Sequence, residues 1–187
     1  ASRVASLNAQ GFPVAQQAHA CEGCDYGNFD PELTEMFEIG SKNSFMNDLS
    51  MQERLSQILI FLRETELLKS TLRSGHMASG RQESVAEHTW RLCLLVMVLA
   101  PEFPDVDAHR LMKICLVHDL GEALQGDIPA PLQDPNIDKS KSEREDLLEL
   151  LSPLPELQRS EILELWEEYE QAATPEAKLA KAFDKLE

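Results

Sequence analysis

Residues 107–120 restrict the possible folds of this chain more than any other segment. Their apolar residues recur at helical spacing and are Leu111, Ile114, Cys115, Leu116 and Val117. A helix that is apolar on most of its sides must be covered by other elements, which is typical of the centre of a hydrophobic core. We therefore expect residues 107–120 to form a helix in the middle of a folded domain.

Helical spacing continues on the N-terminal side of this segment. Apolar residues three and four positions apart predict a helix over residues 50–70. Ser84 and Glu87 fit a capping box, in which each side chain satisfies the other residue's free backbone N–H, so a helix should cover about 85–100. Residues 73–83 contain two glycines and show no period, and we expect a loop there.

The C-terminal part of the chain predicts two further helices. The apolar positions of the first are Ile162, Leu163, Leu165, Trp166 and Tyr169. Thr174 is placed to cap the second, because Pro175 then falls in the first turn, where proline is tolerated. Nothing in the sequence indicates a strand or an internal repeat, and the predicted fold class is therefore all-α.

The composition of the chain limits its partners. Its 187 residues are 43% hydrophobic and carry a formal net charge of -16. No apolar run approaches the roughly 20 residues of a membrane helix, and the negative overall field repels polyanions. We expect neither a membrane nor a nucleic-acid polymer as partner. A phosphate-bearing small molecule remains compatible, since a bound metal and one or two arginines can reverse the potential locally.

The N-terminal segment differs in composition from the rest of the chain. Residues 1–44 are rich in Ala, Gln, Gly, Ser and Asn, and we expect an N-terminal extension of unknown role before a domain over residues 45–187. Cys21 and Cys24 form a C-x-x-C without the second pair of a zinc ribbon, which favours a plain loop over a structural zinc. No continuous apolar region precedes Cys21, so we predict no secretory signal. Because no acidic residue precedes Glu22, the segment also fits the remnant of an organelle-targeting sequence.

The helix over residues 107–120 ends in the pair His118 and Asp119, followed by Glu122. Burying an unpaired charge costs several kcal/mol, so something must compensate this pair. On a continuous helix Glu122 would lie about 40° from His118 and about 60° from Asp119, so the three side chains could converge. A metal ion would compensate them. The alternative for an isolated pair is a hydrogen-bonded core histidine beside a capping aspartate.

Two more polar residues stand in apolar surroundings. His88 lies in the first turn of the helix predicted over about 85–100, and Asp184 lies beside Phe183 in the last predicted helix. With His118 and Asp119 they form a set of two imidazoles and two carboxylates. Such a set suits Mn, Co, Fe, Ni or Zn and leaves positions for water and a phosphate oxygen.

The order H…HD…D, carried by His88, His118-Asp119 and Asp184, resembles the HD-domain superfamily of metal-dependent phosphohydrolases. The resemblance covers about residues 50–187. It implies a helical bundle of about six helices, a divalent metal ion (Mn, Co, Fe, Ni, Zn or Mg) and these four residues as its ligands.

Longer phrases resemble the 5′-deoxynucleotidase branch of this superfamily. They are Glu-Ser-Val-Ala-Glu-His at 83–88 and His-Asp-Leu-Gly-Glu-Ala-Leu-Gln-Gly-Asp-Ile-Pro at 118–129, with Leu68-Lys69 and Arg73 upstream. The resemblance implies hydrolysis of a deoxynucleoside 5′-monophosphate to deoxynucleoside and phosphate by a homodimer. The free cysteines in apolar helical stretches, Cys93 and Cys115, fit a reducing, cytoplasmic setting.

Three further roles follow from the same resemblance. Arg73 binds the substrate phosphate, Glu122 works as acid or base near the attacking water, and Asp127 supports the water or the sugar. Without the family context, Arg73 would be a solvated arginine at a helix end and Glu122 an exposed carboxylate. Asp127 would then stabilise a turn.

Other hypotheses stay open. The chain could be an HD phosphohydrolase or phosphodiesterase acting on another phosphorylated metabolite, or a non-catalytic module that binds a metal or a nucleotide.

The other histidines and the two ends of the chain are not assigned to the site. His109 should face away from His118 on their shared helix, and His76 is expected to be a solvated loop residue. Residues 1–44 match nothing in the family pattern. Family members usually continue the helix after Asp184, so we expect a domain truncated at its C-terminal end.

Overall fold

The computed structural model describes residues 51–126 and 139–187, which are predominantly helical. Arg54–Glu187 form one compact unit. The α-helices of the described residues are α2 (Met51–Glu64), α3 (Val85–Leu99), α4 (Ala108–Val117), α5 (Glu122–Gln125), α6 (Lys139–Leu151), α7 (Glu156–Gln171) and α8 (Pro175–Leu186). The shorter elements are η1 (Thr65–Lys69), η2 (Ala100–Glu102), β1 (Leu72–His76) and β2 (Gln82–Ser84). Six of these α-helices have ten or more residues, which confirms the predicted all-α fold class.

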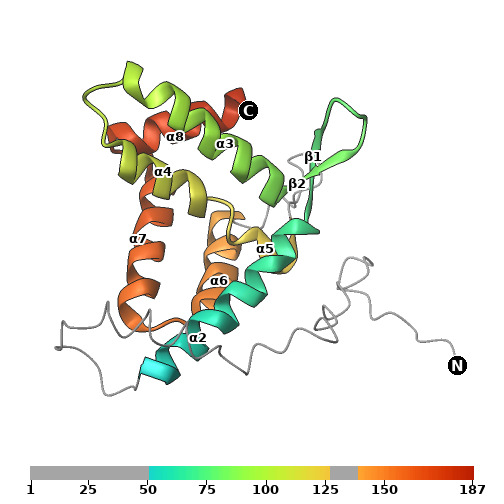
Figure 1. The fold of residues 1–187 in the computed structure, drawn as a ribbon, viewed down its shortest axis with the longest axis vertical. Helices are drawn as coiled ribbons and strands as arrows, with labels where there is room; N and C mark the ends of the chain where they lie inside the picture. The colour runs from blue at the N-terminus through green and yellow to red at the C-terminus, as the bar shows by residue number, and fades with distance from the viewer. Residues whose placement is uncertain (1–50, 127–138) are drawn as a thin grey trace, which may run out of the picture. The chain divides into compact units, whose positions relative to one another are not determined.

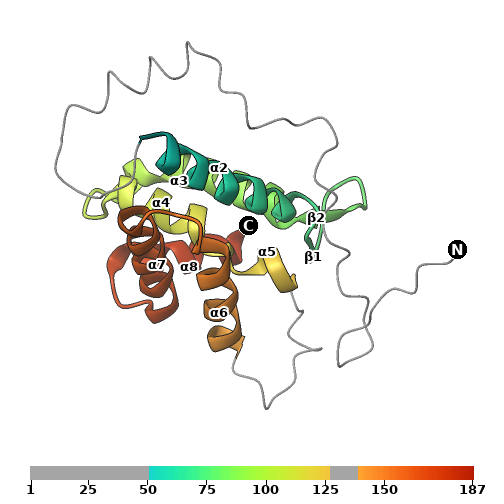
Figure 2. The same ribbon diagram turned by 90° about the horizontal axis from the view of Figure 1, so that it is seen from below.

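Helix α4 lies at the centre of the core, as its apolar sequence predicts. Leu111, Ile114 and Cys115 are completely buried. Helix α4 packs against α3, α7 and α8, and α8 also contacts α3 (Figures 1 and 2). Helix α6 packs against α5 and α7. The core therefore consists of helices that meet around the segment ending at His118.

Local signals identified the starts of two helices correctly. Ser84 Oγ accepts a hydrogen bond from Glu87 N, and the Glu87 carboxylate accepts one from Ser84 N, so the predicted capping box at the start of α3 is confirmed. Thr174 caps α8 by accepting a hydrogen bond from Ala177 N, with Pro175 in the first turn. These caps set the first turn of the two helices that carry His88 and Asp184.

The segment expected to be a loop over residues 73–83 instead contains a β-hairpin. Strands β1 and β2 pair in antiparallel fashion, and backbone bonds between Met77 and Arg81 and between Gly80 and Met77 close the turn. Gly80 has a φ of 84°, a conformation that glycine adopts without steric cost. The prediction of no strand was wrong because the strands are short and polar, and their pairing is not visible in a helical or alternating pattern.

Two boundaries also differ from the predicted ones. Helix α2 ends at Glu64 and continues as the tighter η1, so the helix predicted over residues 50–70 is interrupted. Helix α4 ends at Val117, and a turn separates it from α5. The predicted division at residue 45 lies outside the described residues and stays a prediction, as does the loop at Cys21 and Cys24.

Among the described residues, none of the helices is long and apolar enough to cross a membrane.

Candidate metal centre

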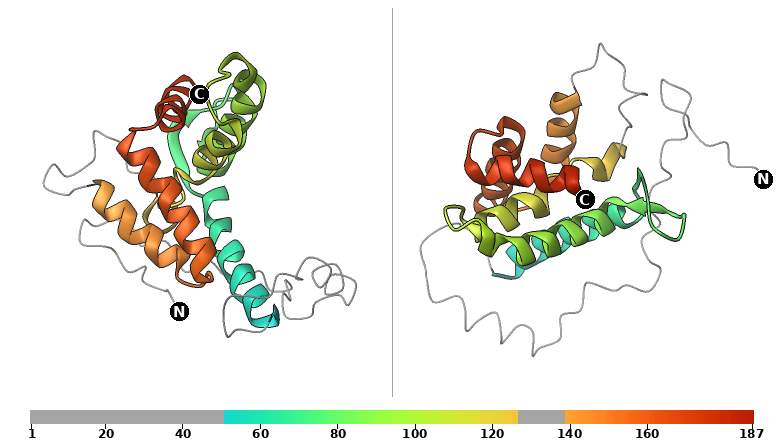
Figure 3. Two further views of the ribbon diagram at one scale, coloured as in Figure 1. Left: turned by 90° about the vertical axis from the view of Figure 1, so that its left-hand side faces the viewer. Right: turned by 90° about the horizontal axis from the view of Figure 1, so that it is seen from above.

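His88, His118, Asp119 and Asp184 come together from three parts of the fold. His88 lies in the first turn of α3, His118 and Asp119 directly follow α4, and Asp184 lies near the end of α8. Figure 3 shows the C-terminal end of α8 close to α3. His88 Nε2 lies 3.1 Å from Asp184 Oδ1, and His118 Nε2 lies 3.1 Å from Asp119 Oδ2 and 3.7 Å from Asp184 Oδ1. The four residues predicted to be ligands are thus neighbours in space.

The two imidazoles point buried nitrogen atoms at these carboxylates without completing hydrogen bonds. His88 and His118 are 2% and 4% exposed, and within the described part of the chain the Nε2 atom of each has no hydrogen-bond partner. Buried polar nitrogens normally have partners, because leaving them unsatisfied costs about 1–3 kcal/mol. His88, His118 and Asp119 each offer one atom that could bind a metal, and these three atoms lie within 4.8 Å of one another. This donor set fits a divalent cation, which would satisfy both nitrogens.

A hydrogen bond from the back of the His118 ring determines which nitrogen faces the site. Nδ1 of His118 lies 2.9 Å from the carbonyl oxygen of Cys115. A carbonyl oxygen only accepts, so Nδ1 carries the proton, and a neutral His118 keeps its lone pair on Nε2. Histidines that bind metals are usually oriented in this way by a partner on the second ring nitrogen.

The charges of the site are strongly coupled. Burial disfavours the charged form of His118, but the charges of Asp119 and Asp184 outweigh burial and raise the pKa of His118 to about 10. Burial also opposes ionisation of Asp184, yet the neighbouring imidazoles and Tyr169 hold the pKa of that carboxyl far below its usual range. The carboxylates therefore attract positive charge, whether it is a proton on His118 or a cation.

Arg73 reaches the same carboxylates from strand β1. Its Nη1 donates a hydrogen bond of 2.6 Å to Asp119 Oδ2, and its Nη2 lies 3.8 Å from Asp184 Oδ1. The side chain of Arg73 keeps 24% of its surface exposed. The hairpin that the sequence did not predict is therefore the element that brings this predicted site residue into place.

Glu122 is buried close to the site, although not for the predicted reason. The helix ends before His118, so a continuous helical turn does not align Glu122 with His118 and Asp119. Instead, Glu122 N donates a 3.1 Å bond to the carbonyl oxygen of Asp119 within the turn. Its carboxylate lies 3.9 Å from Lys139 Nζ of α6, and the residue is 6% exposed. The alternative of an exposed carboxylate is excluded.

The other predicted residues are Asp127, His76 and His109. Asp127 lies outside the described residues. His76 and His109 are exposed, as expected, and neither is among the residues whose donor atoms cluster in the described part of the chain.

Tyr169 of α7 is a site residue that sequence reasoning missed. Its hydroxyl donates a 2.9 Å hydrogen bond to Asp184 Oδ2, and its ring centroid lies 5.0 Å from that of His118. In the sequence Tyr169 is one of the apolar positions of an amphipathic helix, and this spacing indicates a core residue. Only its contacts with Asp184 and His118, which are distant in the sequence, distinguish it from an ordinary core residue.

Glu83, His88 and Glu187 form a second group of close donor atoms. One donor atom of each lies within 4.8 Å of the others. The Glu187 side chain is 2% exposed, and its Oε2 lies 3.3 Å from Arg91 Nη2. Because this group shares His88 with the first one, and a neutral imidazole offers one lone pair, the two groups are not independent metal sites.

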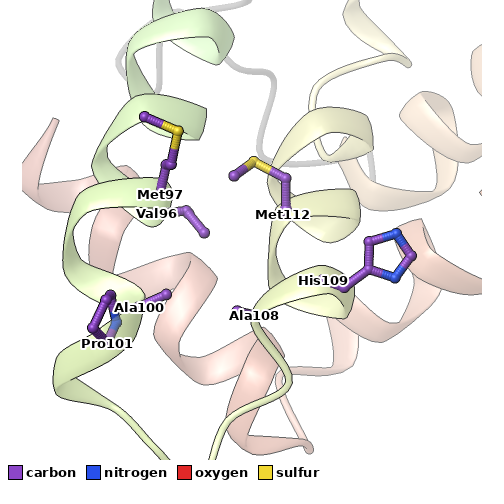
Figure 4. A pocket seen from close by; sticks show the side chains of 7 residues that line it. All are labelled: Val96, Met97, Ala100, Pro101, Ala108, His109 and Met112. Atoms are coloured by element: carbon purple, nitrogen blue, oxygen red, sulfur yellow. The ribbon is translucent and has the colours of Figure 1, made fainter.

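An apolar groove lies away from this chemistry, between the end of α3 and the start of α4. Its lining residues, labelled in Figure 4, are Val96, Met97, Ala100, Pro101, Ala108, His109 and Met112. His88 and His118 lie at the opposite ends of the same two helices. The groove is therefore separate from the polar cluster.

Comparisons with known proteins agree with this geometry. The HD domain family matches residues 65–187. The chain is 36% identical over 132 residues to the human protein named 5′-deoxynucleotidase HDDC2, and the match covers 70% of this chain and 64% of that protein. The fission yeast protein named 5′-deoxynucleotidase hdd1 is 38% identical over 136 residues, covering 70% of this chain and 68% of that protein. The chain thus spans less than two thirds of the human relative.

A solved structure is similar in both fold and sequence. The predicted metal-dependent phosphohydrolase from Magnetospirillum magnetotacticum has a TM-score of 0.64 and 32% identity, covering 72% of this chain and 70% of that one. The family match extends over more than half of the sequence and includes His88, His118, Asp119 and Asp184. This chain belongs to the HD domain family.

Proposed function

We propose that this chain is a metal-dependent phosphohydrolase that hydrolyses a deoxynucleoside 5′-monophosphate to the deoxynucleoside and inorganic phosphate. The observation that carries the proposal is the pair of buried imidazole nitrogens, on His88 and His118, that face carboxylates beside Arg73. The names of the curated relatives support the nucleotide substrate.

In this proposal His88, His118, Asp119 and Asp184 hold one divalent metal ion. The mixed nitrogen and oxygen donors favour Mn, Co, Fe, Ni or Zn, with Mg less suited because it prefers oxygen ligands. When bound, such an ion offsets negative charge on phosphoryl oxygens and makes water more acidic.

Arg73 is the proposed phosphate-binding residue. Asp119 occupies one side of its guanidinium through the 2.6 Å bond from Nη1. A guanidinium has five N–H donors in a planar fork, so donors remain for phosphate oxygens. The ion pair with Asp119 holds the fork next to the ligand cluster, and the partial exposure of Arg73 lets a phosphate reach it.

Glu122 is the proposed acid or base. Its backbone N–H donates to the Asp119 carbonyl within a tight turn, which places Glu122 beside a proposed ligand, and the residue is 6% exposed. A carboxyl group in such an environment can accept a proton from the attacking water and return it to the leaving oxygen. Asp127 remains the proposed support for the water or the sugar, as the family resemblance implies.

Phosphate release from a panel of substrates tests the proposed reaction. The purified protein is loaded with Mn or Co and assayed with deoxynucleoside monophosphates, ribonucleoside monophosphates, cyclic nucleotides and phosphodiesters. We expect turnover of the deoxynucleoside monophosphates. Turnover of other substrates alone would instead support a phosphohydrolase or phosphodiesterase of different specificity. No turnover of any nucleotide with either metal would contradict the proposal and favour a non-catalytic module.

The Glu122→Gln variant separates chemistry from binding. It should lose hydrolysis by about 10²-fold or more while it still binds nucleotide, since general acid–base groups typically contribute about 10²–10⁴-fold. Glu149→Gln, on an exposed position of α6, is the matched control and should keep full activity.

We also propose a homodimer that buries the outer face of α3. Four large apolar residues lie on this face at helical spacing: Trp90, Leu94, Met97 and Val98, which are 37–66% exposed. Sedimentation at several concentrations should detect a dimer that Val98→Glu weakens. Leu157→Glu, at a 70% exposed apolar residue of α7, should leave it intact.

A cytoplasmic location is proposed as well, supported by the two free cysteines of α3 and α4, Cys93 and Cys115. Fractionation of cells that express the full-length protein would test it, and recovery in an oxidising compartment would contradict it.

A further inference from the structure

Tyr169 contacts two of the four proposed metal ligands at once. It lies on α7, is 8% exposed, and donates a 2.9 Å hydrogen bond from its hydroxyl to Asp184 Oδ2. The other oxygen of this carboxylate, Oδ1, faces His88 Nε2 at 3.1 Å and His118 Nε2 at 3.7 Å. The two oxygens of Asp184 therefore have different partners, one on α7 and one at the ligand cluster.

The ring of Tyr169 also limits the position of His118. The two ring centroids lie 5.0 Å apart with an angle of 58° between the planes. On the Tyr169 ring itself, Lys181 Nζ lies 4.0 Å from the centroid, and Lys181 is paired with Glu170 Oε1 at 3.4 Å. The Tyr169 ring thus contacts both a cation from α8 and the imidazole that follows α4.

A carboxylate on a two-bond side chain can rotate, and rotation of Asp184 would exchange its oxygens at the cluster. A hydrogen bond to Oδ2 fixes this rotation. A tyrosine hydroxyl is protonated at neutral pH, so it can donate to Asp184 Oδ2 there. Partners that orient metal ligands in this way typically contribute about 10–100-fold to metal affinity.

We propose that Tyr169 is a positioning residue of the metal centre. Its hydroxyl holds Asp184 with Oδ1 toward the ion, and its ring holds His118. The inference rests on the proposed function only in requiring a metal at these four ligands. It does not depend on the substrate or on hydrolysis.

Cobalt binding to the Tyr169→Phe variant tests the proposal, because this change removes the hydroxyl and keeps the ring. Metal-free wild type and variant are titrated with Co²⁺, and the dissociation constant and visible absorption spectrum are recorded. We expect the dissociation constant to rise about 10–100-fold and the spectrum to change, since Asp184 is released. The thermal midpoint of each metal-free protein shows that both are folded.

Lys181→Met is the matched control. It removes the cation over the same ring and leaves the hydroxyl, so its cobalt affinity and spectrum should resemble those of the wild type. An unchanged affinity and spectrum in Tyr169→Phe would overturn the proposal, and so would an equal loss in Lys181→Met. A wild type that binds no cobalt would overturn this proposal and the proposed function together. Weakened binding in Tyr169→Phe with a wild type that hydrolyses no nucleotide would support Tyr169 and contradict the proposed function.

Discussion

Asp119 lies between a guanidinium and an imidazole. Its Oδ2 is 2.6 Å from Arg73 Nη1 and 3.1 Å from His118 Nε2. Burial acts against ionisation of Asp119, but His118 and then Arg73 outweigh it and lower the pKa of this carboxyl. Asp119 is therefore ionised at neutral pH and available to a cation.

Replacing Asp119 by alanine should abolish metal binding. The change removes a charged donor and leaves the Arg73 guanidinium facing the remaining ligands, which repels a cation. We expect less than one tenth of the wild-type metal content after gel filtration, measured by elemental analysis, and activity reduced by about 10²-fold or more. Asp105→Ala, at an exposed aspartate before α4, should retain both. Wild-type metal content in Asp119→Ala would contradict the ligand assignment.

At the scale of single residues, the sequence indicated which polar side chains come together better than it indicated their surroundings. His88, His118, Asp119 and Asp184 were predicted to be ligands from residue order and family resemblance, and the structure brings these four side chains together. The role of Tyr169 was not visible, because its hydrogen bond joins two helices and its spacing is that of a core residue. Glu122 was placed near the site from a helix that in fact ends before it.

At the scale of elements, local signals were reliable and pairing between segments was not. The capping box at Ser84 depends on four consecutive residues, and it could be read directly from the sequence. The hairpin of β1 and β2 depends on pairing between residues up to twelve positions apart, with Leu72 opposite Ser84. The hairpin carries Arg73, so the element that the sequence did not reveal also positions a proposed substrate-binding residue.

Ser84→Ala should weaken both the fold and the site. Ser84 is 2% exposed and caps the turn that contains His88. Loss of a cap costs about 0.5–2 kcal/mol of stability, which urea unfolding of the metal-free protein can measure. Because the first turn of α3 positions His88, the metal affinity should fall as well. Asp107→Ala removes the cap of α4 at the end far from His118, and it should cost similar stability without a change in affinity.

Gly121→Ala tests the contact between the turn after Asp119 and α6. A Cβ at Gly121 would lie 2.7 Å from the backbone oxygen of Glu143, so one of the two segments must move. Overpacking of this kind typically costs about 1–3 kcal/mol in urea unfolding, and the displaced turn should also lower activity through Glu122. At Gly75 an added Cβ meets only Glu83 Oε2, at 3.7 Å, so Gly75→Ala should be milder. Equal losses in both variants would contradict the expected clash.

At the scale of the whole molecule, ion pairs join α7 to the central helix despite the net charge of -16. Arg110 of α4 donates from Nε to Glu168 Oε2 at 2.7 Å and from Nη2 to Glu164 Oε1 at 2.9 Å. Glu168 is 9% exposed and also accepts a hydrogen bond from Thr174, the cap of α8. Glu168 therefore connects the elements that carry His118, Tyr169 and Asp184.

This connection should make stability depend on pH in a defined range. Burial alone would raise the pKa of Glu168, but Arg110 and Thr174 outweigh it and lower the pKa below its ordinary value of 4.5. A carboxyl with a lowered folded-state pKa stabilises the fold above its unfolded-state pKa, and this contribution disappears as the pH falls through the folded-state value.

The Glu168→Gln variant should therefore lose about 1.5–3 kcal/mol of unfolding free energy relative to wild type at pH 7, which is the usual contribution of hydrogen bonds to a charged group. In urea unfolding the difference between the two proteins should be constant above about pH 5 and should shrink steadily below about pH 4. Glu164→Gln removes the 70% exposed partner of the same arginine and should cost at most about 1 kcal/mol. A Glu168→Gln deficit as large at pH 3.5 as at pH 7 would show that the charge of Glu168 does not stabilise the fold.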